Sequence, residues 1–219
     1  MPAAPRTPFP RPAPPAPQQP SAAARPPLVL GSTSRYRREL LERLRLPFEV
    51  VDPGVDETPQ PGETPARLAL RLALAKAHAV ARARPDAVVI GSDQVADLDG
   101  QPLGKPGGFG RAAAQLRAMS GRAVVFHTAV AVVHASTGFA QALSAPVRVR
   151  FRALKAEEIE RYLRAEEPWD CAGSARSESL GIALLDAIES DDPTALVGLP
   201  LIRTCALLRA AGLDPLAAP

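Results

Sequence analysis

Residues 28–51 read LVLGSTSRYRRELLERLRLPFEVV, and this stretch decides the fold class. Its first three residues form a short apolar run that predicts a buried strand. Leucines at positions 40, 41 and 44 follow the spacing of one helix face, and residues 48–51 predict a second strand. A strand, a helix and a strand in succession are typical of an α/β protein.

The rest of the chain continues this alternation up to residue 211. Further strands are predicted at residues 87–90, 124–134, 139–151 and 182–188, and helices at residues 64–84, 111–119, 156–166 and 201–211. The two long strands flank Ser136, Thr137 and Gly138, which predicts a hairpin. Strands and helices that alternate around one inserted hairpin predict an α/β fold with a mixed sheet.

The prolines and the net charge are concentrated near the start of the chain. Residues 1–27 hold 11 of the 25 prolines, together with three arginines and no acidic residue, which accounts for the whole net charge of +3. The remaining chain is neutral, so the pI of about 9.2 does not indicate a nucleic-acid-binding surface. Arginines without acids are also typical of a transit peptide, but so many prolines do not suit its amphipathic helix. We predict a disordered Pro/Ala-rich extension at residues 1–27, one folded domain at residues 28–213 and a tail at residues 214–219.

The cysteines and the hydropathy pattern bear on the cellular compartment. Cys171 and Cys205 lie far apart without a CxxC motif, so a reducing compartment is expected. The longest apolar runs, such as residues 129–133, fall far short of the ~20 residues that a membrane span requires. We therefore predict a cytoplasmic protein that has neither a membrane nor a nucleic acid as its partner.

The loop after the first strand has the composition of an anion site. Residues 32–38 read STSRYRR and combine hydroxyl groups and arginines with the free backbone N–H groups of a helix start. A phosphate site and a solvated helix start capped by Ser34 explain this composition about equally well. Arginines in a first helical turn oppose the helix dipole, which favours a bound anion.

Carboxylates and lysines occur further along the chain. Glu57 is predicted to lie in the loop after the second strand, and Asp93 in a Gly-Ser-Asp-Gln loop after the third. Carboxylates at such loop positions suit Mg²⁺ or Mn²⁺. Each carboxylate taken alone is more often a cap or turn residue. Lys76 lies within an otherwise Ala/Leu-rich helix. Lys105 follows Gly104, but the spacing of the glycines and the next residue, a proline, exclude a Walker A phosphate loop.

Five blocks of sequence are specific enough to compare with a known family. They are residues 28–57, IGSDQV at 90–95, LGKP at 103–106, CAGSARSESLGIAL at 171–184 and DPTALVGLP at 192–200. In this order, and over essentially all of residues 28–213, they resemble the Maf family of nucleoside triphosphate pyrophosphatases. Within the family, the chain resembles the branch that hydrolyses 7-methyl-GTP. The motifs that carry this resemblance are Gly-Ser-Asp-Gln, Cys-Ala-Gly-Ser and Ser-Glu. The dTTP/UTP branch carries Ala-Asp-Thr where this chain has Ser-Asp-Gln.

The resemblance implies a two-lobed Maf/ITPase-like α/β fold, with an elongated mixed sheet flanked by helices and a central cleft. It implies a nucleoside triphosphate substrate, a divalent metal cation (Mg²⁺ or Mn²⁺) and, often, a homodimer. In the implied reaction, water attacks the α-phosphate with assistance from the metal. The products are the nucleoside monophosphate and pyrophosphate.

The resemblance also assigns roles to residues that match the family's motifs. Asp93 is the proton acceptor that activates water, and Glu57 holds the metal together with Asp93. The positions expected to contact the triphosphate are Ser32, Arg37, Arg38, Lys76 and Lys105. The positions expected to set base specificity are Tyr36, Gln94 and Glu178.

The chemistry of 7-methylguanine agrees with these positions. Guanine presents an N1–H and an N2 amine, and a carboxylate such as Glu178 can accept hydrogen bonds from both. Methylation at N7 makes the purine cationic, which an aromatic ring such as Tyr36 or Trp169 favours through a cation–π contact. A single tryptophan such as Trp169 is, however, more often a packing residue.

Two alternatives stay open at this point. The first is a broader pyrophosphatase that acts on dTTP, UTP or modified nucleotides. The second is a regulator, for example of septum formation, that binds a nucleotide without hydrolysing it. The second alternative is disfavoured because binding alone does not need a carboxylate that activates water. The chain has the full set of Asp93, Glu57, Lys76 and Lys105.

Overall fold

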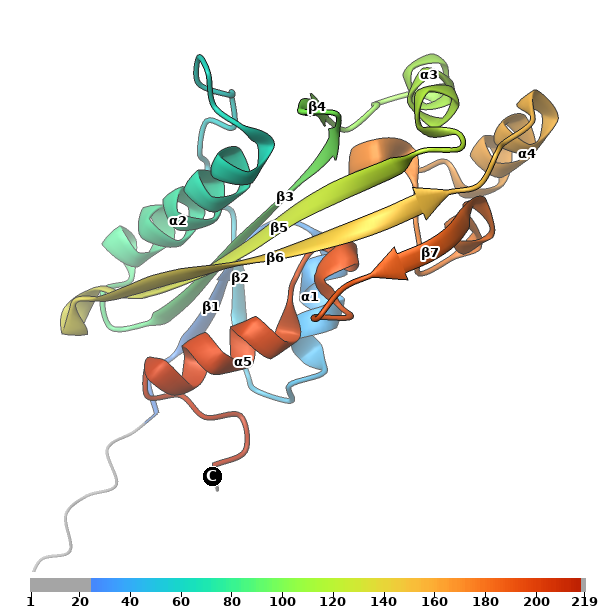
Figure 1. The fold of residues 1–219 in the computed structure, drawn as a ribbon. Helices are drawn as coiled ribbons and strands as arrows, with labels where there is room; N and C mark the ends of the chain where they lie inside the picture. The colour runs from blue at the N-terminus through green and yellow to red at the C-terminus, as the bar shows by residue number, and fades with distance from the viewer. Residues whose placement is uncertain (1–24, 218–219) are drawn as a thin grey trace, which may run out of the picture.

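The structure, a computed structural model, describes residues 25–217 (Figure 1). Its strands are β1 (Leu28–Gly31), β2 (Glu49–Val51), β3 (Val88–Leu98), β4 (Gln101–Leu103), β5 (Ala123–His134), β6 (Phe139–Phe151) and β7 (Leu185–Glu189). They form a seven-stranded sheet in the order β2-β1-β3-β5-β6-β7, with β4 paired to β3. β1 pairs in parallel with β2 and β3, whereas β3, β5, β6 and β7 pair with one another antiparallel. The predicted mixed sheet is confirmed.

Helices cover both faces of this sheet. They are α1 (Arg35–Glu42), α2 (Pro65–Ala83), α3 (Phe109–Met119), α4 (Ala156–Glu166) and α5 (Leu201–Ala210). α2 packs on one face, where Leu68 and Leu72 contact a cluster that includes Val89. α1 and α5 cover the other face and share a second cluster with β1, β3 and β5 (Figure 1). The predicted helices are confirmed, and most of their predicted ends lie within two residues of the observed ends.

Three long strands join two lobes of the molecule. β3, β5 and β6 contain 11, 12 and 13 residues. On one face of β5, Val130 and Val132 pack in the cluster under α1 and α5. Further back along the same face, Val124 and Phe126 pack in a separate cluster with α3 and α4. One strand therefore contributes to both cores, and the predicted two-lobed fold is confirmed.

The helix starts follow from local sequence. The Thr64 hydroxyl accepts a hydrogen bond from the backbone N–H of Arg67, and Pro65 occupies the first helical position of α2. The Ser34 hydroxyl caps α1 in the same way by accepting from the backbone N–H of Arg37. The cap at Ser34 was predicted from the sequence and is confirmed.

The third predicted strand is longer than expected. We predicted that it ends at Ile90 and that Gly-Ser-Asp-Gln forms a loop, but β3 continues through these polar residues to Leu98 and pairs with β5 along that length. Gly91 permits this path, because an added Cβ would lie 2.2 Å from the Ala73 carbonyl oxygen of α2. Asp93 therefore lies within a strand, and the prediction that it lies in a loop was wrong.

The segment predicted as a strand at residues 182–188 was also partly wrong. A 3-10 helix spans Leu180–Leu184, and β7 begins only at Leu185. The short strand β4 was not predicted, because its three residues include a proline and carry no period that separates a strand from a turn.

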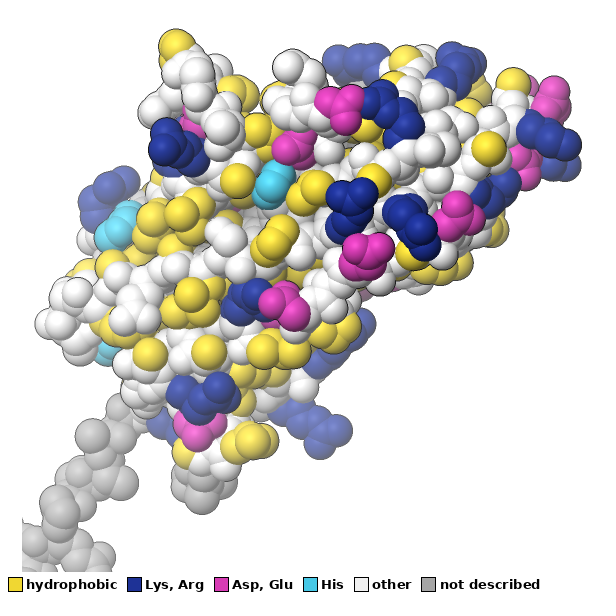
Figure 2. Space-filling model, viewed as in Figure 1, with side chains coloured by type: hydrophobic (Ala, Val, Ile, Leu, Met, Phe, Trp, Pro, Cys, Tyr) yellow, Lys and Arg dark blue, Asp and Glu magenta, His cyan; other side chains and the backbone are white. Residues whose placement is uncertain are grey.

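The surface of the described residues carries both signs of charge. Figure 2 shows basic and acidic side chains interspersed over the visible face, which agrees with the neutral charge balance beyond residue 27. None of the helices in residues 25–217 is both long and apolar enough to cross a membrane. Most of the predicted extension, residues 1–24, lies outside the described part of the chain. The last two residues of the predicted tail, 218 and 219, also lie outside it.

Candidate active site

A cleft of about 780 Å³ lies between the lobes and collects side chains from distant parts of the sequence. Its walls come from the loop after β1, from α2 and from the middle of β3, with contributions from residues 102–105, 170–178 and 196–198. A volume of this size is typical of small-molecule sites. The predicted site residues that line it are Ser32, Tyr36, Arg37, Glu57, Lys76, Asp93, Gln94, Lys105 and Glu178.

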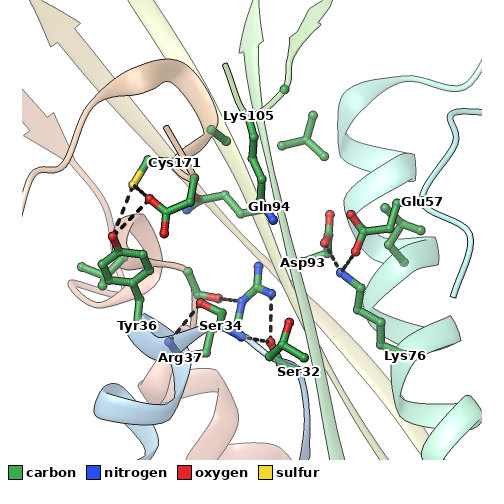
Figure 3. A pocket seen from close by; sticks show the side chains of 18 of the residues that line it. Ser32, Ser34, Tyr36, Arg37, Glu57, Lys76, Asp93, Gln94, Lys105 and Cys171 are labelled. Atoms are coloured by element: carbon green, nitrogen blue, oxygen red, sulfur yellow. Dashed lines mark hydrogen bonds and ion pairs between the residues drawn. The ribbon is translucent and has the colours of Figure 1, made fainter. Parts of the chain in front are cut away.

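A lysine and two carboxylates form one end of the cleft (Figure 3). The Lys76 ammonium lies 2.7 Å from Asp93 Oδ1 and 2.5 Å from Glu57 Oε1. Lys76 and Asp93 are buried, with exposed fractions of 5% and 6%. Burial raises the pKa of Glu57, but the hydrogen bond and charge of Lys76 outweigh it, so that pKa lies below its usual value.

The close approach of α2 to β3 brings Lys76 and Asp93 together. Gly91 has no side chain, so the backbone of α2 lies directly on β3 at that point. Lys76 on the helix then reaches Asp93, which follows Gly91 by two residues. A helix that packs on a strand holds both groups more firmly than loops would.

Arg37 occupies the floor of the cleft beside this triad. Its Nε donates to the Gly198 carbonyl at 2.9 Å, and its Nη1 donates to Ser32 Oγ at 3.3 Å. Burial lowers the pKa of the Arg37 guanidinium, while the charges of Asp93 and Glu57 raise it. The two interpretations of the 32–38 loop are therefore compatible, since Ser34 caps α1 while Arg37 faces the cleft.

Arg38 and Lys105 differ in their relation to the cleft. The Arg38 side chain is exposed, pairs with Glu42 at 3.1 Å and lines a separate shallow depression beside Phe48. The structure therefore does not bring Arg38 to the other predicted phosphate-binding residues. Lys105 does line the cleft, and within residues 25–217 its ammonium has no hydrogen-bond or ion-pair partner.

Tyr36 lies at the other end of the cleft. Its hydroxyl accepts a hydrogen bond from Arg35 at 2.7 Å and donates to Asp170 Oδ1 at 3.4 Å. The guanidinium carbons of Arg35 and Arg176 lie 4.7 and 5.5 Å from the ring centroid. The ring is already flanked by two cations, which argues against the hypothesis that its face binds a cationic purine.

The Cys171 thiol joins the same cluster, 3.7 Å from the Tyr36 hydroxyl. Burial raises the pKa of Tyr36 to about 12. Burial also raises the pKa of Cys171, although the hydrogen bond with Tyr36 lowers it in part. Both groups are therefore neutral at physiological pH, and Tyr36 keeps its donor.

Gln94 and Glu178 are the other two predicted specificity residues. The Gln94 side-chain nitrogen donates to the Thr128 hydroxyl and to the Ala195 and Leu196 carbonyls, at 2.9 to 3.0 Å. Gln94 thereby holds the turn that begins at Ala195 against β3. Glu178 is largely exposed, but partial desolvation of its carboxylate raises its pKa, and the charge of Arg176 lowers it in part.

Trp169 was considered as a partner of the base, but it does not line the cleft. Its ring packs edge-on against Phe109 at 6.3 Å between centroids, and it is partly buried on the core that contains α3 and α4. The interpretation of Trp169 as a packing residue is therefore the better one.

Sequence reasoning missed the residues that support Arg37. Gly198 has a φ of +114°, and its carbonyl accepts from Arg37 Nε and from the Ser92 hydroxyl. Asp192 is fully buried and accepts hydrogen bonds from the Thr194 hydroxyl and the backbone N–H of Arg203, so it joins the segment before Gly198 to α5. The block DPTALVGLP was noticed in the sequence, but its spacing alone carried no indication that it supports a cleft residue.

Comparison with known proteins identifies the class to which this fold and cleft belong. The family model described as "Maf-like protein" matches residues 27–211. The chain therefore belongs to the Maf family.

Several curated relatives are similar over most of their length. A protein of a Polaromonas species named 7-methyl-GTP pyrophosphatase is 72% identical over 186 residues, which cover 85% of each chain. The protein of that name from Albidiferax ferrireducens is 66% identical and covers 87% of this chain and 96% of its own. The Bordetella pertussis protein of the same name is 63% identical, with 87% and 95% covered.

Proposed function

We propose that this chain hydrolyses a nucleoside triphosphate, 7-methyl-GTP, to the nucleoside monophosphate and pyrophosphate. The observation that carries the proposal is a buried carboxylate, Asp93, in a cleft that also holds Arg37, Lys76 and Lys105. Relatives that are 63 to 72% identical bear the name of this activity.

The cations of the cleft suit the phosphate chain. A nucleoside triphosphate carries about four negative charges at neutral pH, and catalysis of phosphoryl transfer rests mainly on positioning and charge stabilisation. Arg37 is held in place by Gly198 and Ser32 and offers a fixed donor. Lys105 lies across the cleft as a second cation whose ammonium is available to phosphate oxygens.

Asp93 is the group best suited to accept a proton from water. The oxygen of that water forms a bond to the α-phosphorus as the bond to the oxygen bridging the α- and β-phosphorus atoms breaks. The electron pair of the broken bond leaves with pyrophosphate, and the proton passes to the carboxylate. Lys76 fixes the orientation of that carboxylate through its contact at 2.7 Å.

Glu57 and Asp93 supply the oxygen ligands that Mg²⁺ or Mn²⁺ prefers. No group of three or more His, Cys, Asp and Glu side chains in residues 25–217 could hold a metal ion. Two carboxylates fit a cation that takes its remaining ligands from phosphate oxygens and water. A bound divalent ion would supply positive charge that stabilises the phosphates during hydrolysis.

The base end of the cleft supports a guanine substrate. Glu178 lines the cleft, and a carboxylate accepts hydrogen bonds from both the N1–H and the N2 amine of guanine. A pyrimidine offers no matching pair of donors. Specificity for 7-methylguanine over guanine is supported by the names of the relatives.

We also propose that the protein is cytoplasmic and forms a homodimer. Cys171 and Cys205 are both free thiols, which suits a reducing compartment. The homodimer rests on the family resemblance alone, and light scattering on the purified protein tests it directly.

The experiment that tests the function is pyrophosphate release from 7-methyl-GTP, GTP, UTP and dTTP, with Mg²⁺ and with Mn²⁺. We expect 7-methyl-GTP to be the best substrate, followed by GTP. Faster hydrolysis of UTP or dTTP would overturn the base assignment and leave the reaction intact. Nucleotide binding without release of pyrophosphate would overturn the reaction itself and favour a regulator.

A further inference from the structure

The loop that carries Lys105 is held near the cleft by hydrogen bonds to its backbone and by the burial of Pro106. It joins β4 to α3 and contains glycines at positions 104, 107 and 108. An added Cβ at Gly104 or Gly108 would meet nothing within 4 Å, so these glycines do not fit a tight space. They leave the backbone conformationally free, and the position of Lys105 therefore depends on what holds the loop.

One residue outside the cleft forms a hydrogen bond to this loop. Gln115 lies on α3, and its side-chain nitrogen donates to the Gly104 carbonyl at 2.9 Å, next to Lys105. Its side-chain oxygen accepts from Ser174 Oγ at 2.5 Å. Gln115 does not line the cleft and therefore does not itself reach the substrate.

Ser174, which donates to the side-chain oxygen of Gln115, lies in a closely packed turn. Ser174 is fully buried and has a φ of +55°, and it follows Gly173, whose φ is +69°. An added Cβ at Gly173 would lie 3.1 Å from the ring of Phe126, so the turn is packed directly on β5. A second bond, from the Gly107 N–H to the Trp169 carbonyl at 2.9 Å, joins the loop to the same region.

We propose that Gln115 is a positioning residue that holds the Lys105 loop against the segment of residues 170–175. That segment forms the wall of the cleft next to Tyr36. The side chain of Gln115 thus ties a phosphate-binding group to the wall that faces the base. This proposal rests on the proposed function, because it takes Lys105 as a contact of the triphosphate.

The decisive test is a double-mutant cycle between Gln115 and Lys105. Gln115→Met removes both hydrogen bonds and keeps the length of the side chain. We expect the KM for 7-methyl-GTP to rise about fivefold to tenfold in Gln115→Met, with kcat changed by less than about twofold. In a Lys105→Ala background the same substitution should add less than about twofold, because the group it positions is gone.

Two further variants separate positioning from a general loss of structure. Gln115→Glu keeps the acceptor for Ser174 but cannot donate to the Gly104 carbonyl, so its KM should match that of Gln115→Met. Arg117→Met changes an exposed residue on the same helix and should leave KM unchanged. Additive effects in the cycle, a wild-type KM in Gln115→Glu, or an equal rise in Arg117→Met would each overturn the proposal.

A binding measurement keeps this test independent of hydrolysis. Inorganic tripolyphosphate carries the charges of the substrate without its base, and calorimetry gives its affinity for each variant. We expect Gln115→Met and Lys105→Ala to weaken it by similar factors. Equal affinity in Gln115→Met and the wild type would overturn the role of Gln115. Failure of the wild type to release pyrophosphate would overturn the proposed function alone.

Discussion

The end of the cleft that we propose to be catalytic and the end that we propose to bind the base differ in the burial of their side chains and in the elements that carry them. We refer to them as the catalytic end and the base end. Lys76 and Asp93 are buried and lie on α2 and in the middle of β3, whereas Glu57, which contacts Lys76, is exposed and lies between β2 and α2. Asp170 and Glu178 are exposed and belong to the irregular segment between α4 and β7. Reacting groups must be held to within about 0.5 Å of the productive geometry, and groups on helices and strands are held more precisely than groups on loops.

The difference also appears in the contacts within each end. At the catalytic end, one lysine contacts two carboxylates at 2.5 and 2.7 Å. At the base end, Tyr36 is linked to Asp170 at 3.4 Å and to the Cys171 thiol at 3.7 Å. Substitutions at the catalytic end should therefore cost turnover, while those at the base end should change which nucleotide is chosen.

The largest expected effect is the loss of turnover in Asp93→Asn. An amide cannot accept the proton from water, and general-base assistance is typically worth about 10²–10⁴ in rate. We expect kcat to fall by about that factor while the affinity for tripolyphosphate changes by less than about threefold. Steady-state pyrophosphate release and calorimetry measure the two quantities. A kcat within a fewfold of the wild type would remove Asp93 from the role of base.

The next largest effect tests the close packing of α2 on β3. Gly91→Ala places a Cβ 2.2 Å from the Ala73 carbonyl oxygen and 2.6 Å from the Ala77 nitrogen, so α2 must move away from β3. We expect the free energy of unfolding to fall by about 1–3 kcal/mol, and kcat to fall because Lys76 moves with the helix. Urea unfolding checks the first effect and pyrophosphate release the second.

A matched control comes from α3. An added Cβ at Gly110 would meet nothing within 4 Å, so Gly110→Ala should be neutral or should stabilise the protein by up to about 1 kcal/mol. A similar loss of stability in both variants would show that close packing at Gly91 is not the cause.

Gly91 also marks the point at which sequence reasoning failed. Apolar runs and helical periods predicted most of the elements, because burial of one face is visible in the sequence. The polar residues after Ile90 were taken as a loop, but they continue β3 because the strand lines a cleft on one side. Local sequence does not reveal that a helix from elsewhere in the chain will cover Gly91.

The candidate site also contains residues that the sequence predicted and residues that it did not. Nine of the ten residues singled out in the sequence line one cleft, and their roles stay predictions. Arg38 does not line it, and the spacing of Arg38 and Glu42 by four residues already favoured an ion pair on an exposed helix face. Gly198 and Gln115 could not be found, because they act through hydrogen bonds between segments far apart in the sequence.

A smaller effect is expected at the base end in Glu178→Gln. The substitution replaces a charged acceptor with an amide that has one acceptor oxygen, and hydrogen bonds to charged groups contribute roughly 1.5–3 kcal/mol. The ratio of kcat/KM between GTP and UTP should fall about tenfold, with no comparable loss of kcat on the best substrate. A panel of nucleotides measures the ratio. An unchanged ratio would show that Glu178 does not contact the base.

The smallest expected effect is a change in alkaline stability in Tyr36→Phe. Burial raises the pKa of Tyr36 from its ordinary value of 10.0 to about 12, although the hydrogen bond from Arg35 lowers it in part. The folded state therefore binds this proton more tightly than the unfolded state. The stability that it contributes is complete below pH 10.0 and is lost as the pH rises toward about 12.

Tyr36 is only half-buried, so solvent screening should hold this contribution to less than about 1 kcal/mol. Phenylalanine keeps the ring between the guanidinium groups of Arg35 and Arg176 but has no proton to lose. Urea unfolding at several pH values between 8 and 11 should therefore show a steeper decline for the wild type than for Tyr36→Phe. Parallel declines would mean that the hydroxyl is solvated in the free protein, and the base end would then be looser than the contacts of Tyr36 with Asp170 and Cys171 indicate.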